Sequence, residues 1–171
     1  MILVLDNFLS DTECQFWRDY CVYANNNETM EVGLKSDKPM HRVDRNYYTV
    51  RSPFSFMDKV IKVVEEKWQE KFYFQRQSYG HIMHYKIPGQ GLQWHAEPNI
   101  AKVSVSINLS PDHEYEGAEF EIKDHNIKLP LGSAIFYESN LQHRVTPLIS
   151  GHKKSFVMWL PNEKIGKKRL K

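Results

Sequence analysis

The clearest pattern in the chain is a strict alternation of apolar and polar residues near its middle. Residues 102–109 read Lys-Val-Ser-Val-Ser-Ile-Asn-Leu, which predicts a strand with one apolar and one polar face. Other runs, separated by turns rich in Gly, Pro, Asp and Asn, predict further strands. They cover residues 2–5, 72–87, 91–97, 118–122, 126–129, 133–137, 141–146 and 153–160. The second half of the chain is therefore expected to be mostly β.

The first half carries a pattern of helical period. Ser10 and Glu13 form a capping box, which predicts a helix from there to about residue 23. Ser52-Pro53 opens a second helix, whose apolar residues recur every three or four positions. These are Met57, Val60, Ile61, Val64 and Trp68. Residues 33–52 lack a clear period, and we expect a long loop or ragged hairpin there, a common place for a functional lid.

The order of these elements predicts a fold class. Two helices followed by about eight strands suggest a closed or sandwiched antiparallel sheet with the helices packed outside. A chain of 171 residues has the size of a single domain. We expect residues 1–80 to form the helices and a lid region, residues 81–162 the β core, and residues 163–171 a basic, solvated tail.

Composition excludes several classes of protein. The chain is 41% hydrophobic and 26% charged, as in an ordinary globular domain, and a net charge of +2 is too small to indicate nucleic-acid binding. It has no apolar run of about 18 residues, so no membrane span is expected. Cys14 and Cys21 would lie about 10 Å apart along one helix, too far for a disulfide. Free thiols and a first segment unlike a signal peptide predict a cytoplasmic protein.

Among eight histidines, two lie in an arrangement that suits metal binding. His95 and Glu97 are two positions apart in a predicted strand, so their side chains project from the same face. His143, on another strand, would complete a set of two imidazoles and one carboxylate. That set leaves one side of an octahedral Fe(II) open for other ligands. No metal role is expected for His81, His84, His113, His125 and His152.

A lysine at the start of the last apolar strand adds a second element of chemistry. Lys153 follows His143 by ten residues, and a cation buried there would need an anionic partner. A dicarboxylate co-substrate would supply one, and Ser155, on the same face, would add a hydrogen bond. Alternatively, Lys153 and Lys154 both cap the strand end and face solvent. The sequence also leaves open which of the two lysines is the anchor.

Several segments have the order and composition of motifs that occur together in one enzyme family. They are Tyr85 with Pro88-Gly89 and His95, residues 115–120 with Ala118 at a usual glycine, residues 127–147, and Gly151-x-Lys153 followed by Trp159. Residues 6–14 match the usual opening of these domains. With these motifs the chain resembles the Fe(II)/2-oxoglutarate-dependent dioxygenases, specifically the prolyl 4-hydroxylase-like group and its PKHD-type hydroxylases. The likeness covers roughly residues 1–16 and 83–160.

This resemblance implies a fold, an activity and a set of site residues. The fold would be mainly β (α+β), a double-stranded β-helix (jelly roll, cupin-like) core with N-terminal helices outside the major sheet. The activity would be hydroxylation of a prolyl or other amino-acid-type carbon with Fe(II), O2 and 2-oxoglutarate, which becomes succinate and CO2; ascorbate is a candidate reductant. The substrate would be a peptide, a protein or an amino-acid-type molecule. The implied residues are His95, Glu97 and His143 for the metal, Lys153, Tyr85 and Ser155 for 2-oxoglutarate, and Arg42, Arg45 and Tyr47 for substrate.

Two positions depart from the family pattern. The family usually has aspartate where this chain has Glu97, whose side chain is one methylene longer. The PKHD group usually has arginine where this chain has Lys153, which offers a point charge instead of a bidentate fork. Two other hypotheses therefore stay open. One is a cupin-like module that binds a metal or ligand without turnover, and the other is a zinc hydrolase with the same three ligands, which would have no need of Lys153.

Overall fold

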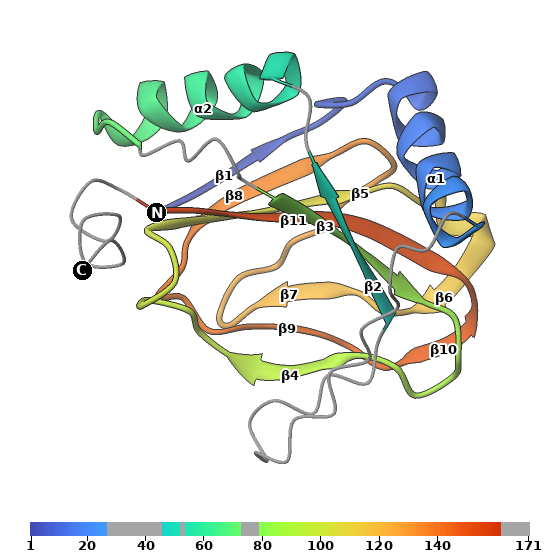
Figure 1. The fold of residues 1–171 in the computed structure, drawn as a ribbon. Coiled ribbons are helices and arrows are strands. Elements are labelled where there is room, and N and C mark those ends of the chain that lie inside the picture. Colours follow the sequence, from blue (N-terminus) through green and yellow to red (C-terminus); the bar gives the residue numbers. More distant parts are fainter. Residues whose placement is uncertain (27–45, 52–53, 73–78, 162–171) are drawn as a thin grey trace.

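The computed structural model describes residues 1–26, 46–51, 54–72 and 79–161 (Figure 1). In chain order the elements are β1 (Ile2–Leu5), α1 (Asp11–Asn26), β2 (Asn46–Arg51), α2 (Phe54–Trp68), β3 (Tyr79–Tyr85), β4 (Leu92–His95), β5 (Val103–Asn108), the short 3-10 helix η2 (Asp112–Glu114), β6 (Tyr115–Gly117), β7 (Phe120–Ile122), β8 (Ala134–Glu138), β9 (His143–Val145), β10 (Leu148–Gly151) and β11 (Lys153–Leu160). The expected tail at residues 163–171 lies outside the described residues, and the division of the chain into segments stays a prediction.

The strands form two layers. Six strands make an antiparallel major sheet in the order β1-β8-β5-β11-β3-β2. The minor layer contains the three strands β4-β9-β7 and the pair β10-β6. Figure 1 shows the minor layer beneath the major sheet, with α1 and α2 on the opposite, outer side. This arrangement is the double-stranded β-helix with external helices, so the predicted fold class is confirmed.

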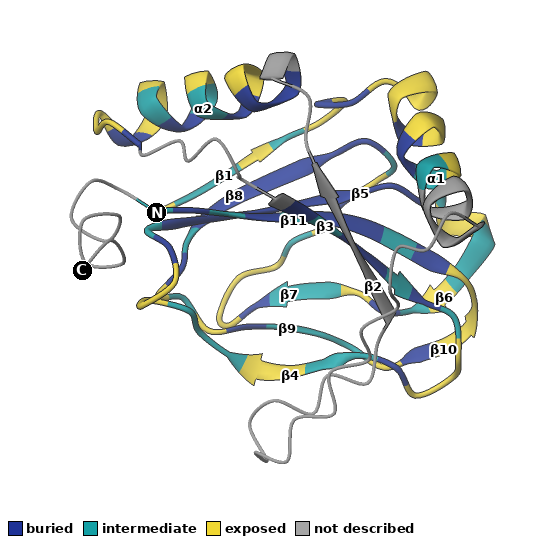
Figure 2. Ribbon diagram, in the orientation of Figure 1, coloured by how far each residue is buried: buried dark blue, intermediate teal, exposed yellow. Residues whose placement is uncertain are grey.

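The largest apolar cluster lies between the two helices and the major sheet. The rings of Trp17 from α1, Phe56 from α2 and Phe156 from β11 meet with centroids 5.1 to 5.5 Å apart. A Cβ on Gly80 would lie 2.0 Å from the Phe156 ring, so only glycine lets this ring pack against β3. The inward sides of the helices are correspondingly buried and their outward sides exposed (Figure 2). This cluster fixes the helices on the outer face of the sheet.

The predicted capping box holds the start of α1. The backbone N–H of Ser10 donates to Glu13 Oε2 over 2.8 Å, and the N–H of Glu13 donates to Ser10 Oγ over 3.2 Å. Two N–H groups that have no partner within the helix are thereby satisfied. The predicted cap of the second helix, Ser52-Pro53, lies outside the described residues. In the described part of the chain, no helix has the length and apolarity needed to cross a membrane.

The expectation of a loop or ragged hairpin over residues 33–52 is wrong for its last residues. Asn46–Arg51 forms β2, which pairs with β3 from Asn46 opposite His84 to Arg51 opposite Tyr79. This strand exists because an edge of the major sheet is available to it. Such a partner lies far away in sequence, so the local pattern does not reveal it.

The strand expected at residues 126–129 is also absent. Asp124 turns the chain after β7 with φ 63°, and the segment that follows leaves the sheet. The Leu129 carbonyl accepts a hydrogen bond from the side-chain amide of Asn108 over 2.8 Å, in place of a strand partner. Asn108 is therefore committed to this loop, although it lies on the polar face of β5. The short strands β6 and β10, which the sequence did not predict, pair with each other nearby.

Candidate active site

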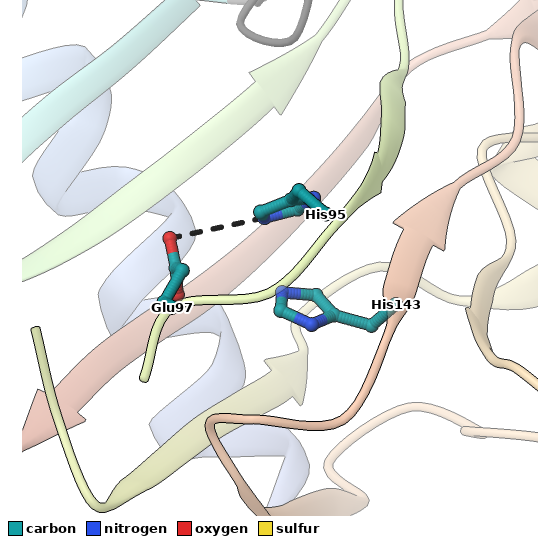
Figure 3. Close-up of side chains that lie close together, drawn as sticks. All are labelled: His95, Glu97 and His143. Atoms are coloured by element: carbon teal, nitrogen blue, oxygen red, sulfur yellow. Dashed lines mark ion pairs between the residues drawn. The ribbon is translucent and has the colours of Figure 1, made fainter. Parts of the chain in front are cut away.

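Two strands of the minor layer bring His95, Glu97 and His143 together. His95 ends β4 and pairs with His143 at the start of β9, and Glu97 lies two residues beyond β4. One potential ligand atom from each residue lies within 4.8 Å of the other two. The imidazole centroids are 4.1 Å apart, and Figure 3 shows the three side chains converging on one space. The three residues predicted as metal ligands are thus neighbours in the fold.

Backbone hydrogen bonds orient both imidazoles. Nδ1 of His95 donates to the carbonyl oxygen of Gln93 over 2.8 Å. Nδ1 of His143 donates in the same way to Leu141 over 3.0 Å. Because a carbonyl oxygen can only accept, each Nδ1 carries the proton, and the lone pair of the neutral ring lies on Nε2. This tautomer is the one in which an imidazole can bind a metal through Nε2.

Glu97 is held at three atoms. Its backbone N–H donates to the carbonyl oxygen of Ser139 over 2.7 Å. Its Oε1 lies 3.8 Å from Nε2 of His95, and its Oε2 accepts a hydrogen bond from Nε1 of Trp159. The contact from Trp159 was not predicted from sequence. The alternation of β11 was the available signal, because it places Trp159 on the same strand face as Lys153.

The three side chains face a cavity between the major sheet and the minor layer. Its empty space, counted together with the open mouth, is about 520 Å³. The residues that line it are Met83, Tyr85, Leu92, His95, Glu97, Ser104, Val105, Ser106, Ala118, Phe120, Tyr137, His143, Val145, Lys153, Ser155, Val157, Met158 and Trp159. The site therefore combines a mostly apolar wall with a few polar groups.

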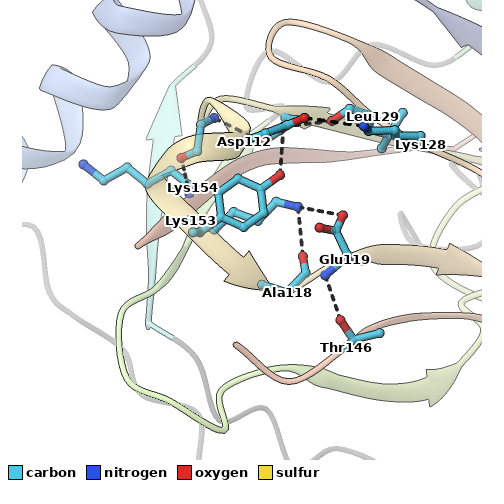
Figure 4. Close-up of polar contacts among 11 residues, drawn as sticks. Asp112, Ala118, Glu119, Lys128, Leu129, Thr146, Lys153 and Lys154 are labelled. Atoms are coloured by element: carbon cyan, nitrogen blue, oxygen red, sulfur yellow. Dashed lines mark hydrogen bonds and ion pairs between the residues drawn. The ribbon is translucent and has the colours of Figure 1, made fainter. Parts of the chain in front are cut away.

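Lys153 is buried in this cavity, with a relative exposure of 3%. Its Nζ donates to the carbonyl oxygen of Ala118 over 2.9 Å, lies 3.8 Å from Glu119 Oε2 and sits 4.4 Å from the ring centroid of Tyr115 (Figure 4). Burial lowers the pKa of Lys153 to about 8, although the nearby carboxylate of Glu119 opposes that shift. An anion that enters the cavity would therefore meet a weakly hydrated ammonium group.

The adjacent lysine faces the other way. Nζ of Lys154 donates to the backbone carbonyl of Arg18 in α1 over 3.0 Å, on the outer side of the major sheet. Arg18 in turn donates to both carboxylate oxygens of Glu114, at 2.7 and 2.6 Å. Of the two lysines, Lys153 lines the cavity, and Lys154 connects β11 to α1 through its hydrogen bond to Arg18. The alternative in which both face solvent is wrong for Lys153.

Tyr85 and Ser155, the other residues expected to contact 2-oxoglutarate, line the same cavity. Tyr85 is 2% exposed and lies opposite Lys153 in the pairing of β3 with β11. Ser155 is 9% exposed and lies two residues along β11. The three residues form one polar region on the major sheet, across from the histidines of the minor layer.

The side chains of the expected substrate contacts lie outside the described part of the chain. Arg42 and Arg45 lie outside the described residues. Tyr47 lies in β2, where its backbone pairs with Met83, and its side chain is outside the described part. They stay predictions.

The other histidines in the described part of the chain lie apart from this set. His113, His125 and His152 are exposed. His81 packs edge-on against Trp159 with ring centroids 5.0 Å apart, whereas the His84 ring is 5.7 Å from that of His152. The two histidines of β3 therefore point to different sides of the strand.

Comparisons with known proteins give relatives in sequence over part of the chain. No protein-family model matches. A PKHD-type hydroxylase of Hyphomonas neptunium is 44% identical over 62 residues, 34% of this chain and 28% of that protein. A PKHD-type hydroxylase of Methylobacterium nodulans is 36% identical over 77 residues, 43% of this chain and 32% of that protein. The chain covers less than a third of the length of these curated relatives.

Solved structures extend the likeness to nearly the whole chain. A viral collagen prolyl hydroxylase from Paramecium bursaria Chlorella virus-1, in complex with 2-oxoglutarate, has a TM-score of 0.66 and 20% identity, covering 93% of this chain and 94% of that one. A prolyl 4-hydroxylase of Pseudomonas putida has a TM-score of 0.73 and 15% identity, covering 94% and 92%. A prolyl hydroxylase of Trichoplax adhaerens, in complex with a peptide of a hypoxia-inducible factor, has a TM-score of 0.73 and 13% identity, covering 98% and 86%. The chain is thus related in sequence to PKHD-type hydroxylases over about a third of its length, and it shares the fold of the prolyl hydroxylases of the 2-oxoglutarate/Fe(II) oxygenase group over nearly all of it.

Proposed function

We propose that this chain is an Fe(II)- and 2-oxoglutarate-dependent oxygenase that hydroxylates a prolyl or other amino-acid-type carbon. The observation that carries the proposal is the position of two polar groups in one cavity. His95, Glu97 and His143 present three donor atoms within 4.8 Å of one another, and the buried ammonium group of Lys153 lines the same cavity.

The donor set fits Fe(II). Two imidazoles and one carboxylate on one side of an octahedral ion leave positions for a chelating co-substrate and for dioxygen. Iron bound there would supply the oxidation of a C–H bond by O2, coupled to conversion of 2-oxoglutarate to succinate and CO2. In this proposal His95 and His143 bind through Nε2, and Glu97 binds through one oxygen.

The protein's own groups bind and orient the co-substrate. Lys153 pairs with the distal carboxylate of 2-oxoglutarate, because its buried ammonium group gains from a closer anionic partner than the exposed carboxylate of Glu119, which lies 3.8 Å away. The hydroxyls of Tyr85 and Ser155 lie on the same wall and donate to that carboxylate. The apolar side chains between these groups and the metal ligands exclude water from the reaction.

The identity of the substrate rests on analogy. The neighbour from Trichoplax adhaerens was solved with a peptide, and we propose a peptide or protein substrate here, with free amino-acid-type molecules as the alternative. Arg42, Arg45 and Tyr47 are the proposed contacts, and ascorbate the proposed reductant. We also propose a cytoplasmic location, because the thiol of Cys14 is free and buried.

The test is to mix purified protein with Fe(II) and 2-oxoglutarate without oxygen and to look for the visible absorption band of the chelate. Oxygen is then admitted and succinate is measured. We expect the band and succinate in wild-type protein and in His125→Ala, whose residue is exposed and outside the site. A folded protein that gives neither would favour the inert module. Binding of Zn(II) with hydrolysis and without succinate would favour the hydrolase.

A further inference from the structure

We propose that Trp159 is a positioning residue that makes Glu97 a one-oxygen ligand and so compensates for the extra methylene of this glutamate. The inference rests on the proposed metal site. It assigns a role to a residue that does not itself contact the metal, and it explains how this chain can use glutamate where aspartate is usual.

The contact between the two side chains gives the two carboxylate oxygens of Glu97 different partners. The indole Nε1–H of Trp159 can only donate, and it donates to Oε2 of Glu97. The other oxygen, Oε1, lies 3.8 Å from Nε2 of His95. One oxygen is thus committed to the indole, and the one that faces the histidines is left to bind the ion.

Glutamate needs such a partner more than aspartate does. Its side chain has one more rotatable bond, so it samples more positions, and fixing it in one of them costs conformational entropy. The main chain of Glu97 is already held by the hydrogen bond to Ser139. The indole fixes the far end of the side chain, so both ends are set before a metal binds.

Trp159 is itself held firmly. It lies in β11, a central strand of the major sheet, where its backbone is opposite Ser104 of β5. The ring of His81 packs against the indole edge-on, with centroids 5.0 Å apart. The hydroxyl of Ser104 is hydrogen-bonded to that of Ser139 over 2.8 Å. The donor and the backbone anchor of Glu97 therefore belong to one connected framework.

The experiment measures Co(II) affinity and the Co(II) electronic spectrum in a double-mutant cycle of Trp159→Phe and Glu97→Asp. Phenylalanine keeps an aromatic ring and removes the N–H. In the wild-type background we expect Co(II) to bind about 10- to 100-fold more weakly, the usual cost of losing a partner that orients a ligand, with a changed spectrum. In the Glu97→Asp background the shorter side chain does not reach the indole, so Trp159→Phe should change affinity by less than about threefold. Trp94→Phe, an exposed tryptophan, is the matched control and should bind Co(II) like wild type.

A second measurement does not depend on the stability of the Trp159 variant. In 15N-labelled protein without metal, the indole N–H signal of Trp159 should shift strongly in Glu97→Ala, while that of Trp17 stays in place. An unshifted Trp159 signal, or an equal loss of affinity from Trp159→Phe in both backgrounds, overturns the inference. If wild type binds Co(II), His143→Ala does not, and Trp159→Phe binds like wild type, this inference fails while the proposed metal site stands. If wild-type protein binds no metal, both fail.

Discussion

The two faces of the major sheet differ in character although the same strands supply both. Along β11, Phe156 and Leu160 belong to the apolar cluster beneath the helices, whereas Lys153, Ser155 and Trp159 line the cavity. The same division holds in β5, where Ile107 packs in the apolar cluster and Ser104 and Ser106 line the cavity. The outer face is built for packing and the inner face for chemistry.

The difference indicates that the outer face stabilises the fold and that the polar groups of the inner face reduce its stability. Apolar side chains on the outer face contribute to folding when they leave water. Polar groups on the inner face cost free energy when buried, unless each finds a partner. Substitutions on the two faces should therefore have different effects. Those on the outer face should lower the free energy of unfolding, and those on the inner face should lower the affinity for metal or co-substrate.

The largest expected effect is the loss of metal binding in His143→Ala. His143 is 3% exposed, and its ring packs against that of Tyr137 with centroids 4.9 Å apart. We expect Co(II) affinity to fall by more than about 100-fold, beyond the usual cost of losing a partner that only orients a ligand. Titration calorimetry measures this, with His125→Ala as the control. Equal losses in both variants would show that the wrong histidines were chosen.

The next effect is on the outer face. Phe156→Ala removes a fully buried ring that contacts Trp17 and Phe56, and we expect the free energy of unfolding to fall by about 3–5 kcal/mol. Urea denaturation followed by circular dichroism measures it. Co(II) affinity should be unchanged in the protein that stays folded. A variant of normal stability with weakened metal binding would contradict the separation of the two faces.

A smaller effect concerns pH and the inner face. Burial places the pKa of Lys153 near 8, and only the protonated form attracts the carboxylate of 2-oxoglutarate. Because the charge is lost as pH rises through this pKa, affinity should fall about tenfold between pH 7 and pH 9. Lys153→Arg stays charged over this range and should give a flat profile. Calorimetry on Mn(II)-loaded protein without oxygen measures both, and parallel profiles would mean that another group titrates.

The smallest effect is at the start of α1, which covers the outer face. Ser10→Ala removes the hydroxyl that caps the helix, and we expect a loss of about 1 kcal/mol in the free energy of unfolding. Denaturation against wild type measures it, and Ser150→Ala, at an exposed position of β10, is the control. Metal and co-substrate affinity should not change. A loss as large as that of Phe156→Ala would show that the cap does more than satisfy the helix end.

Sequence reasoning succeeded where the needed information was local. The spacing of His95 and Glu97 predicted that the two side chains lie close together, and they converge with His143, although Glu97 lies past the end of β4 and not in a strand. The alternation in β5 separated the serines of the cavity from the apolar core. This alternation follows from the period of two in a strand and can be read directly from the sequence.

The rest depended on contacts between distant segments. β2 is a strand because β3 offers it an edge, whereas residues 126–129 leave the sheet and the Leu129 carbonyl accepts its hydrogen bond from the side chain of Asn108. The bond from Trp159 to Glu97 joins residues 62 positions apart. Such pairs are set by how the layers come together, which neither periodicity nor propensity reports.

The neighbouring lysines of β11 show how much depends on the alignment of a single strand. If β11 shifted by one residue, Lys154 would enter the cavity, Lys153 would point at α1, and Phe156 would take the place of Ser155 in the cavity wall. The same shift would turn the Trp159 indole away from Glu97. Backbone hydrogen bonds to β3 on one side and to β5 on the other prevent this movement. The pairing of the backbone therefore determines which side chains of β11 face the cavity.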